Sequence, residues 1–284
     1  MNKNMKEFEI YSNLKVSKTN PVIIRLDGRN FHSLSSDLEF VKPYDARFAK
    51  AMSGVCSDIF KEFSPLFIYS FSDEISILLN EIPFNGRVEK IDSVFASMAS
   101  SSLTSRLQKE YNIDNDKLFD IDEANADFER FKSIMGIKED NSKGEFLTYR
   151  KPISFDSRII PISYEEIPGY FKWRQDESWR NCINSYGIWA LKSEYPADVA
   201  ASKLFGLGLN EIKEILDEKG IHFDEIDTWK KRGFAVYRNI NTIKKYDREF
   251  DENVVEKHKY VYRDFGLPKF DRQFFIKKEI IEDK

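Results

Sequence analysis

The sequence predicts an α+β fold in which an antiparallel sheet carries helices on one face. Two runs rich in β-branched and aromatic residues, at 21–26 and 66–79, have the length and composition of strands. Apolar residues recur with helical spacing over 43–59 and 91–110. The resulting order, β-α-β-β-α, is typical of helices packed on a sheet, and the C-terminal half is expected to be mainly helical.

The composition indicates a globular chain with room for one large core or two modest ones. It has 284 residues, of which 41% are hydrophobic, and a formal net charge of −4. This charge argues against a protein that holds nucleic acid by a bulk excess of cations. Cys56 and Cys182 lie far apart and form no zinc motif or disulfide framework. Since no window approaches the about 18 apolar residues of a membrane span, we expect a cytoplasmic protein without a membrane partner.

Each predicted element has its own signal. Residues 21–26 form a strand that runs into a tight turn at Asp27-Gly28. Pro43 and Asp45 suit the start of a helix. The other expected elements are a hairpin with strands 66–71 and 75–79, a helix over 91–110, a strand over 153–162, and helices over 164–191 and 209–219.

Charge and composition divide the chain into four regions. Residues 1–111 are expected to form the core that carries the candidate site, and residues 112–150 an acidic, solvated insertion. Residues 151–240 supply the second half of that unit, and residues 241–284 a basic C-terminal segment. From Trp229 to the end there are 15 Lys and Arg against 10 Asp and Glu, so a polyanion would be held locally, in this part of the chain.

The candidate chemistry lies at acidic residues that end two strands. Asp27 closes one predicted strand, and Asp73 with Glu74 closes the next, so the carboxylates can converge if the strands lie side by side. Converging oxygens that leave open positions suit Mg²⁺, and Gly28 lets a carbonyl approach such an ion. A pair of ions there would promote in-line displacement at phosphorus. The alternative is two ordinary turns with exposed acids.

The residues around these acids suit a triphosphate. Arg29, Asn30, Phe31 and His32 follow Asp27-Gly28 directly and offer backbone N–H groups, a guanidinium and an imidazole. Lys42 precedes the predicted helix start. Taken alone, His32 would be an ordinary hydrogen-bonded imidazole and Lys42 a solvated surface residue.

Five ordered motifs resemble those of the tRNA-His guanylyltransferase family. The resemblance spans roughly residues 20–240. The family includes a branch of guanylyltransferase-like 3′-to-5′ RNA polymerases, and this chain resembles that branch most. The first motif is the most specific. The motifs are Arg25-Leu26-Asp27-Gly28-Arg29-Asn30-Phe31-His32, Lys42-Pro43-Tyr44-Asp45, Ser72-Asp73-Glu74, Phe155-Asp156-Ser157-Arg158 and Trp173-Arg174-Gln175.

The resemblance implies a polymerase-like palm in which Asp27, Asp73 and the Gly28 carbonyl hold two Mg²⁺ ions and Glu74 is needed for activity. It further implies ATP or GTP as substrates, tRNA as the macromolecular partner and a homotetramer. Residues matching the family's nucleotide site are Asp27, Gly28, Arg29, Asn30, Phe31, His32, Lys42, Asp45, Ser72 and Asp73. Residues matching its contacts with tRNA or a second triphosphate are Arg158, Arg174, Gln175, Asn181, Lys231 and Arg232.

One stretch departs from the family. Guanylyltransferases proper carry His-Ile-Asn-Asn-Leu-Tyr-Asn where this chain has residues 179–185, and within that stretch only Asn181 keeps the family identity. Trp179 replaces the first histidine. The departure favours template-directed repair of 5′-truncated tRNA over dedicated addition of G to tRNA-His.

The leading hypothesis is therefore a Mg²⁺-dependent nucleotidyltransferase that adds nucleotides in the 3′-to-5′ direction to the 5′ end of tRNA. One alternative is a nucleotidyl cyclase with a related palm, which would need no RNA. The other is a non-catalytic tRNA-binding protein of the same fold, for which the intact set of Asp27, Asp73 and Glu74 would be a coincidence.

Overall fold

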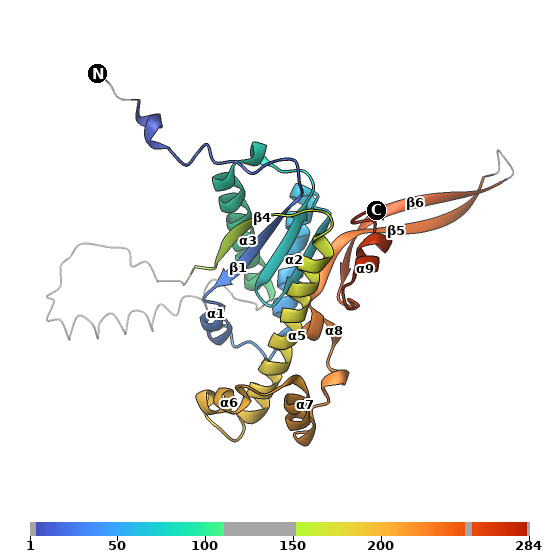
Figure 1. Cartoon of the computed structure of the whole chain (residues 1–284). Helices are drawn as coiled ribbons and strands as arrows, with labels where there is room; N and C mark the ends of the chain where they lie inside the picture. The colour runs from blue at the N-terminus through green and yellow to red at the C-terminus, as the bar shows by residue number, and fades with distance from the viewer. Residues whose placement is uncertain (1–3, 111–151, 248–251, 283–284) are drawn as a thin grey trace.

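The computed structural model describes residues 4–110, 152–247 and 252–282, and at its centre lies a six-stranded sheet (Figure 1). Every neighbouring pair of strands is antiparallel, as expected from the sequence. The strand order is β4-β1-β3-β2-β5-β6. The strands are β1 (Val22–Arg29), β2 (Phe67–Phe71), β3 (Glu74–Leu79), β4 (Ser154–Pro161), β5 (Phe234–Asp247) and β6 (Glu252–Asp264).

Helices cover both faces of the sheet. Ile24 and Leu26 of β1 point to one face, where they join the core under α2 and α3. Ile23 points to the opposite face, where it joins the core under α5 and α9, because alternate residues of a strand face opposite ways. The apolar pattern of the sequence predicted only the first of these layers. The four helices are α2 (Ala46–Phe63), α3 (Val88–Glu110), α5 (Ile167–Leu191) and α9 (Arg272–Lys277).

Strand β1 is longer than predicted, and the tight turn expected at Asp27-Gly28 was wrong. The strand continues to Arg29, and Asp27 pairs in register with Glu74 of β3 on one side and Asp156 of β4 on the other. Pairing on both sides keeps this Asp-Gly step extended. The chain turns instead at Asn30, which has a φ of 60° and precedes α1 (Phe31–Asp37), a helix of 7 residues that the sequence analysis missed.

The C-terminal part contains a long hairpin that was not predicted. Only residues 234–237 of β5 pair with β2, whereas β5 pairs with β6 as far as Asp247. Figure 1 shows the hairpin extending away from the rest of the molecule. The boundary expected at residue 240 falls inside β5, and the insertion expected at 112–150 lies outside the described residues.

A small helical unit lies at the C-terminal end of α5 (Figure 1). Ile183 of α5 packs there with Leu204, Ile212, Leu216 and Phe223, which gives this unit a core of its own. α5 therefore belongs to two bodies, the sheet and the helical unit. Within the described residues, no helix combines the length and apolarity needed to cross a membrane. The remaining helices of the unit are α6 (Ala197–Leu204), α7 (Leu209–Glu218) and α8 (Thr228–Arg232).

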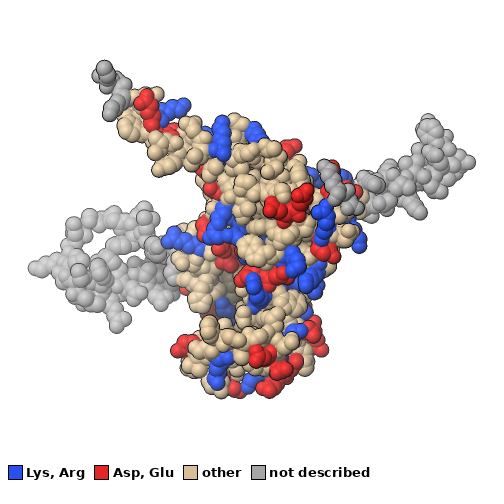
Figure 2. Space-filling model, viewed as in Figure 1, with Lys and Arg blue, Asp and Glu red and all other residues tan. Residues whose placement is uncertain are grey.

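Charged side chains are mixed over the surface rather than segregated. Figure 2 shows Lys and Arg interspersed with Asp and Glu over the visible face, without a large area of one sign. An acidic or basic ligand on this face would thus be held by a few local contacts.

Candidate active site

Two carboxylates, Asp27 and Asp73, meet where β1 passes the turn between β2 and β3. The Gly28 N–H donates a hydrogen bond to the Asp73 carbonyl over 3.2 Å. A Cβ at position 28 would lie 2.9 Å from the Asp73 Cβ and 2.4 Å from the Phe31 ring. A glycine at 28 is what lets the strand lie this close to the turn, so it brings the two acids together.

The electrostatics of this pair favour a bound cation. Burial raises the pKa of Asp73, and the nearby charge of Asp27 raises it further. Two arginines of the same region are engaged with other acids, since Arg158 lies 3.6 Å from Asp156 and Arg174 pairs with Glu74. Two adjacent carboxylates repel each other, and a cation between them removes the repulsion.

The oxygen atoms at this site suit Mg²⁺ better than a metal ion that is coordinated entirely by protein side chains. Among the described residues, no group of three or more His, Cys, Asp or Glu side chains is placed to hold a metal. Asp27 and Asp73 with a backbone carbonyl at Gly28 would leave several positions for water and phosphate oxygens. That is how Mg²⁺ is usually bound at sites of phosphoryl transfer, through one or two carboxylates plus the substrate.

Glu74 follows the turn and is buried against helix α5. Arg174 donates from Nε to Oε1 over 2.8 Å and from Nη2 to Oε2 over 2.6 Å, which is a bidentate ion pair. Burial raises the pKa of Glu74, and the hydrogen bonds from Arg174 act in the opposite direction. The pair ties the carboxylate-bearing hairpin to α5. In this arrangement Arg174 contacts a protein carboxylate, and the expected need for Glu74 in activity stays a prediction.

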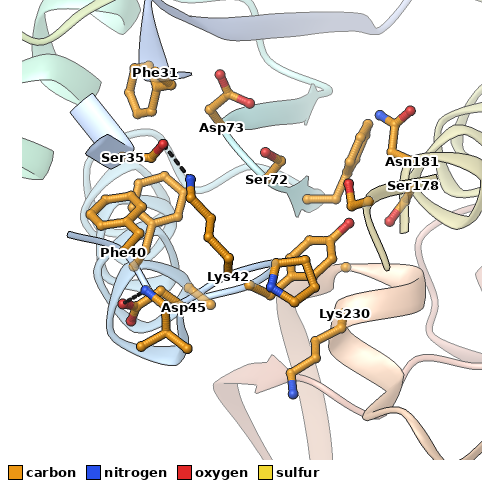
Figure 3. A pocket seen from close by; sticks show the side chains of 18 of the residues that line it. Phe31, Ser35, Phe40, Lys42, Asp45, Ser72, Asp73, Ser178, Asn181 and Lys230 are labelled. Carbon is orange, nitrogen blue, oxygen red and sulfur yellow. Dashed lines mark hydrogen bonds between the residues drawn. The ribbon is translucent and has the colours of Figure 1, made fainter. Parts of the chain in front are cut away.

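A pocket of about 440 Å³ opens beside Asp73 (Figure 3). On one side, the Lys42 amino group donates to the Ser35 hydroxyl over 2.6 Å. Figure 3 shows Ser178 and Asn181 on the opposite side, across from Phe40 and Asp45. A cavity of this size, lined by both polar and aromatic side chains, suits a nucleotide with its phosphates toward Asp73. Its polar and charged lining residues are His32, Ser35, Lys42, Asp45, Ser72, Asp73, Ser178, Asn181, Asn184, Ser185 and Lys230.

Asp45 shapes this pocket from within the protein. Its Oδ1 accepts from the Arg47 N–H over 2.8 Å, which caps α2, and its Oδ2 accepts from the Val41 N–H over 3.0 Å. Burial alone would raise its pKa, but hydrogen bonds from the Arg47 side chain and these N–H groups lower the pKa to about 2. The carboxylate is therefore ionised and fixes the loop that carries Lys42.

Other residues of the expected nucleotide site lie around the end of β1. Phe31 packs against Phe48 and Phe155, with ring centroids 5.9 and 5.4 Å apart, and also borders the pocket. His32 lines the pocket and is exposed. Arg29 and Asn30 are exposed and do not line it, although both lie in the segment that joins β1 to α1.

Three residues expected to contact tRNA or phosphate are instead engaged within the fold. The Lys231 amino group is buried and donates to the carbonyls of Phe223 and Asp224. Gln175 donates to the Pro268 carbonyl and accepts from the Phe270 N–H. Arg232 donates to the Leu267 carbonyl over 3.2 Å. Buried polar groups need such partners. The bonds of Gln175 and Arg232 hold α5 and α8 to the C-terminal segment, and those of Lys231 hold α8 to the segment that precedes it.

The pocket wall on α5 is the part that sequence reasoning missed, apart from Asn181. Ser178, Asn181 and Ser185 are spaced by three and four positions, so they share one face of the helix. That spacing is the signal that could have found them. Lys230 of α8 also lines the pocket, next to Lys231, which does not.

An antiparallel sheet with two paired carboxylates beside a nucleotide-sized pocket defines a palm-like nucleotidyltransferase. A model of the tRNA(His) guanylyltransferase family matches residues 2–163, and the chain belongs to this family. It is 30% identical over 260 residues to the tRNA(His) guanylyltransferase of Kluyveromyces lactis, covering 87% of this chain and 96% of that protein. For the enzyme of Debaryomyces hansenii the identity is 28% over 238 residues, with 81% and 77% covered.

Solved structures show the same fold. A bacterial tRNA(His) guanylyltransferase-like protein in complex with ATP superposes with a TM-score of 0.68 at 21% identity, over 98% of this chain and 97% of that one. The tRNA(His) guanylyltransferase of Saccharomyces cerevisiae gives a TM-score of 0.63 at 23% identity, over 82% and 92%. The family membership decides for a nucleotidyltransferase and against the cyclase and the non-catalytic protein considered above.

Replacing Gly28 with alanine is expected to slow nucleotide transfer by about 100-fold, because the added Cβ forces β1 away from the Asp73 turn. Overpacking should also lower the free energy of unfolding by about 1–3 kcal/mol. Single-turnover transfer assays and urea unfolding measure the two effects. Gly169→Ala is the control, since a Cβ there meets no atom within 4 Å. A Gly28→Ala enzyme with the wild-type rate would contradict the close approach.

Proposed function

We propose that this chain is a Mg²⁺-dependent enzyme that adds nucleotides in the 3′-to-5′ direction to the 5′ end of tRNA, with ATP or GTP as substrates. The observation that carries the proposal is the pair formed by Asp27 and Asp73, of which Asp73 lines the pocket, in a member of this family. The names of the relatives support tRNA as the partner, and one similar structure holds ATP.

The pocket residues would bind and orient the nucleoside triphosphate. Lys42 would neutralise its phosphates, and Ser72 in the turn would donate a hydrogen bond to a phosphate oxygen. Asp27 and Asp73 would hold Mg²⁺, which supplies activation of the attacking hydroxyl and neutralises the leaving group. The ribose 3′-hydroxyl of the bound nucleotide would then attack the 5′ phosphorus of the RNA. Pyrophosphate would leave from an RNA with a 5′-triphosphate, and AMP from an RNA whose 5′-monophosphate has been adenylylated by ATP.

We propose repair of 5′-truncated tRNA as the principal activity. The support comes from position 179, where guanylyltransferases proper carry a histidine. Trp179 does not line the pocket; it packs edge-on against Phe223 at 5.2 Å, and Arg232 lies 5.5 Å from its ring. The aromatic side chain at this position therefore belongs to the packing between α5 and the helical unit, and the family's histidine is absent there.

The experiment compares two RNA substrates with labelled nucleotides, a 5′-truncated tRNA and an intact tRNA-His that lacks its extra G. We expect faster, template-directed extension of the truncated tRNA. Faster addition of G to tRNA-His would identify a dedicated guanylyltransferase instead, and absence of any transfer to either RNA would contradict the proposed function. A reaction without RNA tests for a cyclic product.

A cytoplasmic location and a homotetrameric assembly belong to the same proposal and are supported by the family relationship. Light scattering on the purified chain measures the assembly, and a monomer in the presence of tRNA would contradict it.

A further inference from the structure

An exposed tryptophan lies near the carboxylates but outside the pocket. Trp173 of α5 is 48% exposed, and it is not among the residues that line the nucleotide pocket. Large aromatic side chains dominate protein cores and binding sites, so a half-exposed indole beside a charged site is a candidate contact. Its surroundings show what it could bind.

The ring of Trp173 is held in place from the sheet side. The Arg174 guanidinium lies 4.4 Å from the ring centroid, and the Arg25 guanidinium 5.8 Å. Both arginines lower the pKa of Glu74, so both lie near that carboxylate, toward the sheet. Tyr170 packs against the ring edge at 5.8 Å. Arg174 is fixed by its ion pair with Glu74, so it gives the indole a fixed contact, and 48% of Trp173 stays exposed to solvent.

The strands beside this tryptophan carry an unusual charge pattern. Arg25 of β1 lies directly opposite Arg158 of β4, and Asp27 lies directly opposite Asp156. Like charges in opposite positions destabilise a sheet, so the pattern fits a surface that receives a ligand with both phosphate and a bound cation. Arg158 and Asp156 are about half exposed and are accessible to such a ligand.

A transferase that joins a nucleotide to an RNA end needs two binding sites around its metal-binding carboxylates, one for the nucleotide and one for the RNA end. The pocket reaches Asp73, whereas Asp27 lies on the strand that also carries Arg25 beneath Trp173. The second substrate therefore has Arg25 for its phosphates and the half-exposed indole for its terminal base. Base–aromatic stacking of this kind is tolerant of sequence, as an enzyme that extends different RNA ends requires.

We propose that Trp173 is the stacking platform for the base of the 5′-terminal nucleotide of the acceptor RNA. This inference rests on the proposed function, because it assigns the second substrate of the same reaction. Trp173 binds the substrate through its ring and takes no part in proton or phosphoryl transfer.

The test combines protein variants with a modified RNA in steady-state extension assays on a 5′-triphosphorylated truncated tRNA. Trp173→Leu keeps an apolar cover over Arg174 but cannot stack, and it should raise KM for the RNA by about 10-fold or more. Trp173→Phe should retain most of the affinity. An RNA that is abasic at its 5′-terminal nucleotide should lose the same factor with the wild type and lose nothing further with Trp173→Leu.

Trp189→Leu is the matched control, because Trp189 lies on the same helix with 45% exposure and away from Arg25 and Arg174. Its KM for RNA should stay at the wild-type value. An active wild type that does not distinguish the abasic RNA, or a Trp173→Leu enzyme whose KM changes for the nucleoside triphosphate alone, overturns the inference. A wild type that extends no RNA overturns the proposed function instead, so the two failures are distinguishable.

Discussion

The Asp73→Asn variant is expected to lose nucleotide transfer by about 100-fold or more while its melting temperature rises in the absence of metal. Loss of one metal-binding carboxylate removes several kcal/mol of transition-state stabilisation, by analogy with other metal-dependent transferases. The gain in stability has a separate cause. Burial and the charge of Asp27 both raise the pKa of Asp73, so the ionised form costs stability in the folded protein.

The raised pKa of Asp73 also determines how the stabilities of the wild type and of Asp73→Asn change with pH. The pKa of Asp73 in the folded protein lies above its ordinary value of 3.8, so the folded state binds more protons between these two pKa values. The wild type therefore loses stability as the pH rises through that window, whereas Asp73→Asn does not. The difference in melting temperature should be present at neutral pH and should shrink below pH about 4.

Calorimetry with and without Mg²⁺ and a nucleoside triphosphate measures these effects, alongside transfer assays. Mg²⁺ should raise the melting temperature of the wild type and have little effect on the variant. Asp198→Asn, on helix α6, removes an acid far from the site and serves as the control. An Asp73→Asn protein that is less stable than the wild type and still responds to Mg²⁺ would show that the carboxylate is not part of the metal site.

The Arg174→Met variant is expected to lower the free energy of unfolding by about 3–5 kcal/mol. Both side chains of the Glu74–Arg174 pair are about nine-tenths buried, so removing the guanidinium leaves a buried carboxylate without a partner. Urea unfolding near neutral pH measures the loss. The Glu74→Gln/Arg174→Met double variant should recover much of the stability, because no buried charge remains unpaired.

The chain offers a matched control on the same helix. Arg180 pairs with Glu177, but these side chains are 55% and 32% exposed. Arg180→Met should therefore change the free energy of unfolding by less than about 1 kcal/mol. Equal losses of unfolding free energy for Arg174→Met and Arg180→Met would contradict the prediction that breaking the buried Glu74–Arg174 pair is the more destabilising change.

The part of the site that could be predicted from sequence is the part built within one strand or turn. Asp27-Gly28 and Ser72-Asp73 are local signals. The strand expected beside β1 was the one that Asp73 closes, β2, whereas the structure places β3 between β1 and β2. The partner of Glu74 could not be predicted, because Arg174 lies 100 positions away and only the packing of α5 on the sheet brings it there.

The surroundings of Lys231 and the β5–β6 hairpin could not be predicted from the sequence, because tertiary packing determines both. Lys231 stands in a basic run that indicated phosphate contact, yet the carbonyls of Phe223 and Asp224 bind its amino group inside the helical unit. The β5–β6 hairpin was not predicted although it contains β-branched and aromatic residues, because beyond Tyr237 it pairs only with itself and no neighbouring strand imposes an apolar face. A polar stripe on α5 was equally ambiguous, since most such stripes face solvent.

Helix α5 is one unbroken element of 25 residues, and this fixes the spacing of the whole site along the chain. Arg174 is tied to the hairpin, and Ser178 and Asn181 face the pocket one and two turns further on. Each residue of an α-helix adds about 100° of rotation, so one residue gained or lost after Arg174 would turn the pocket wall away from the nucleotide. The number of residues between Arg174 and this wall is therefore a constraint on the chain that is separate from the identity of any side chain in it.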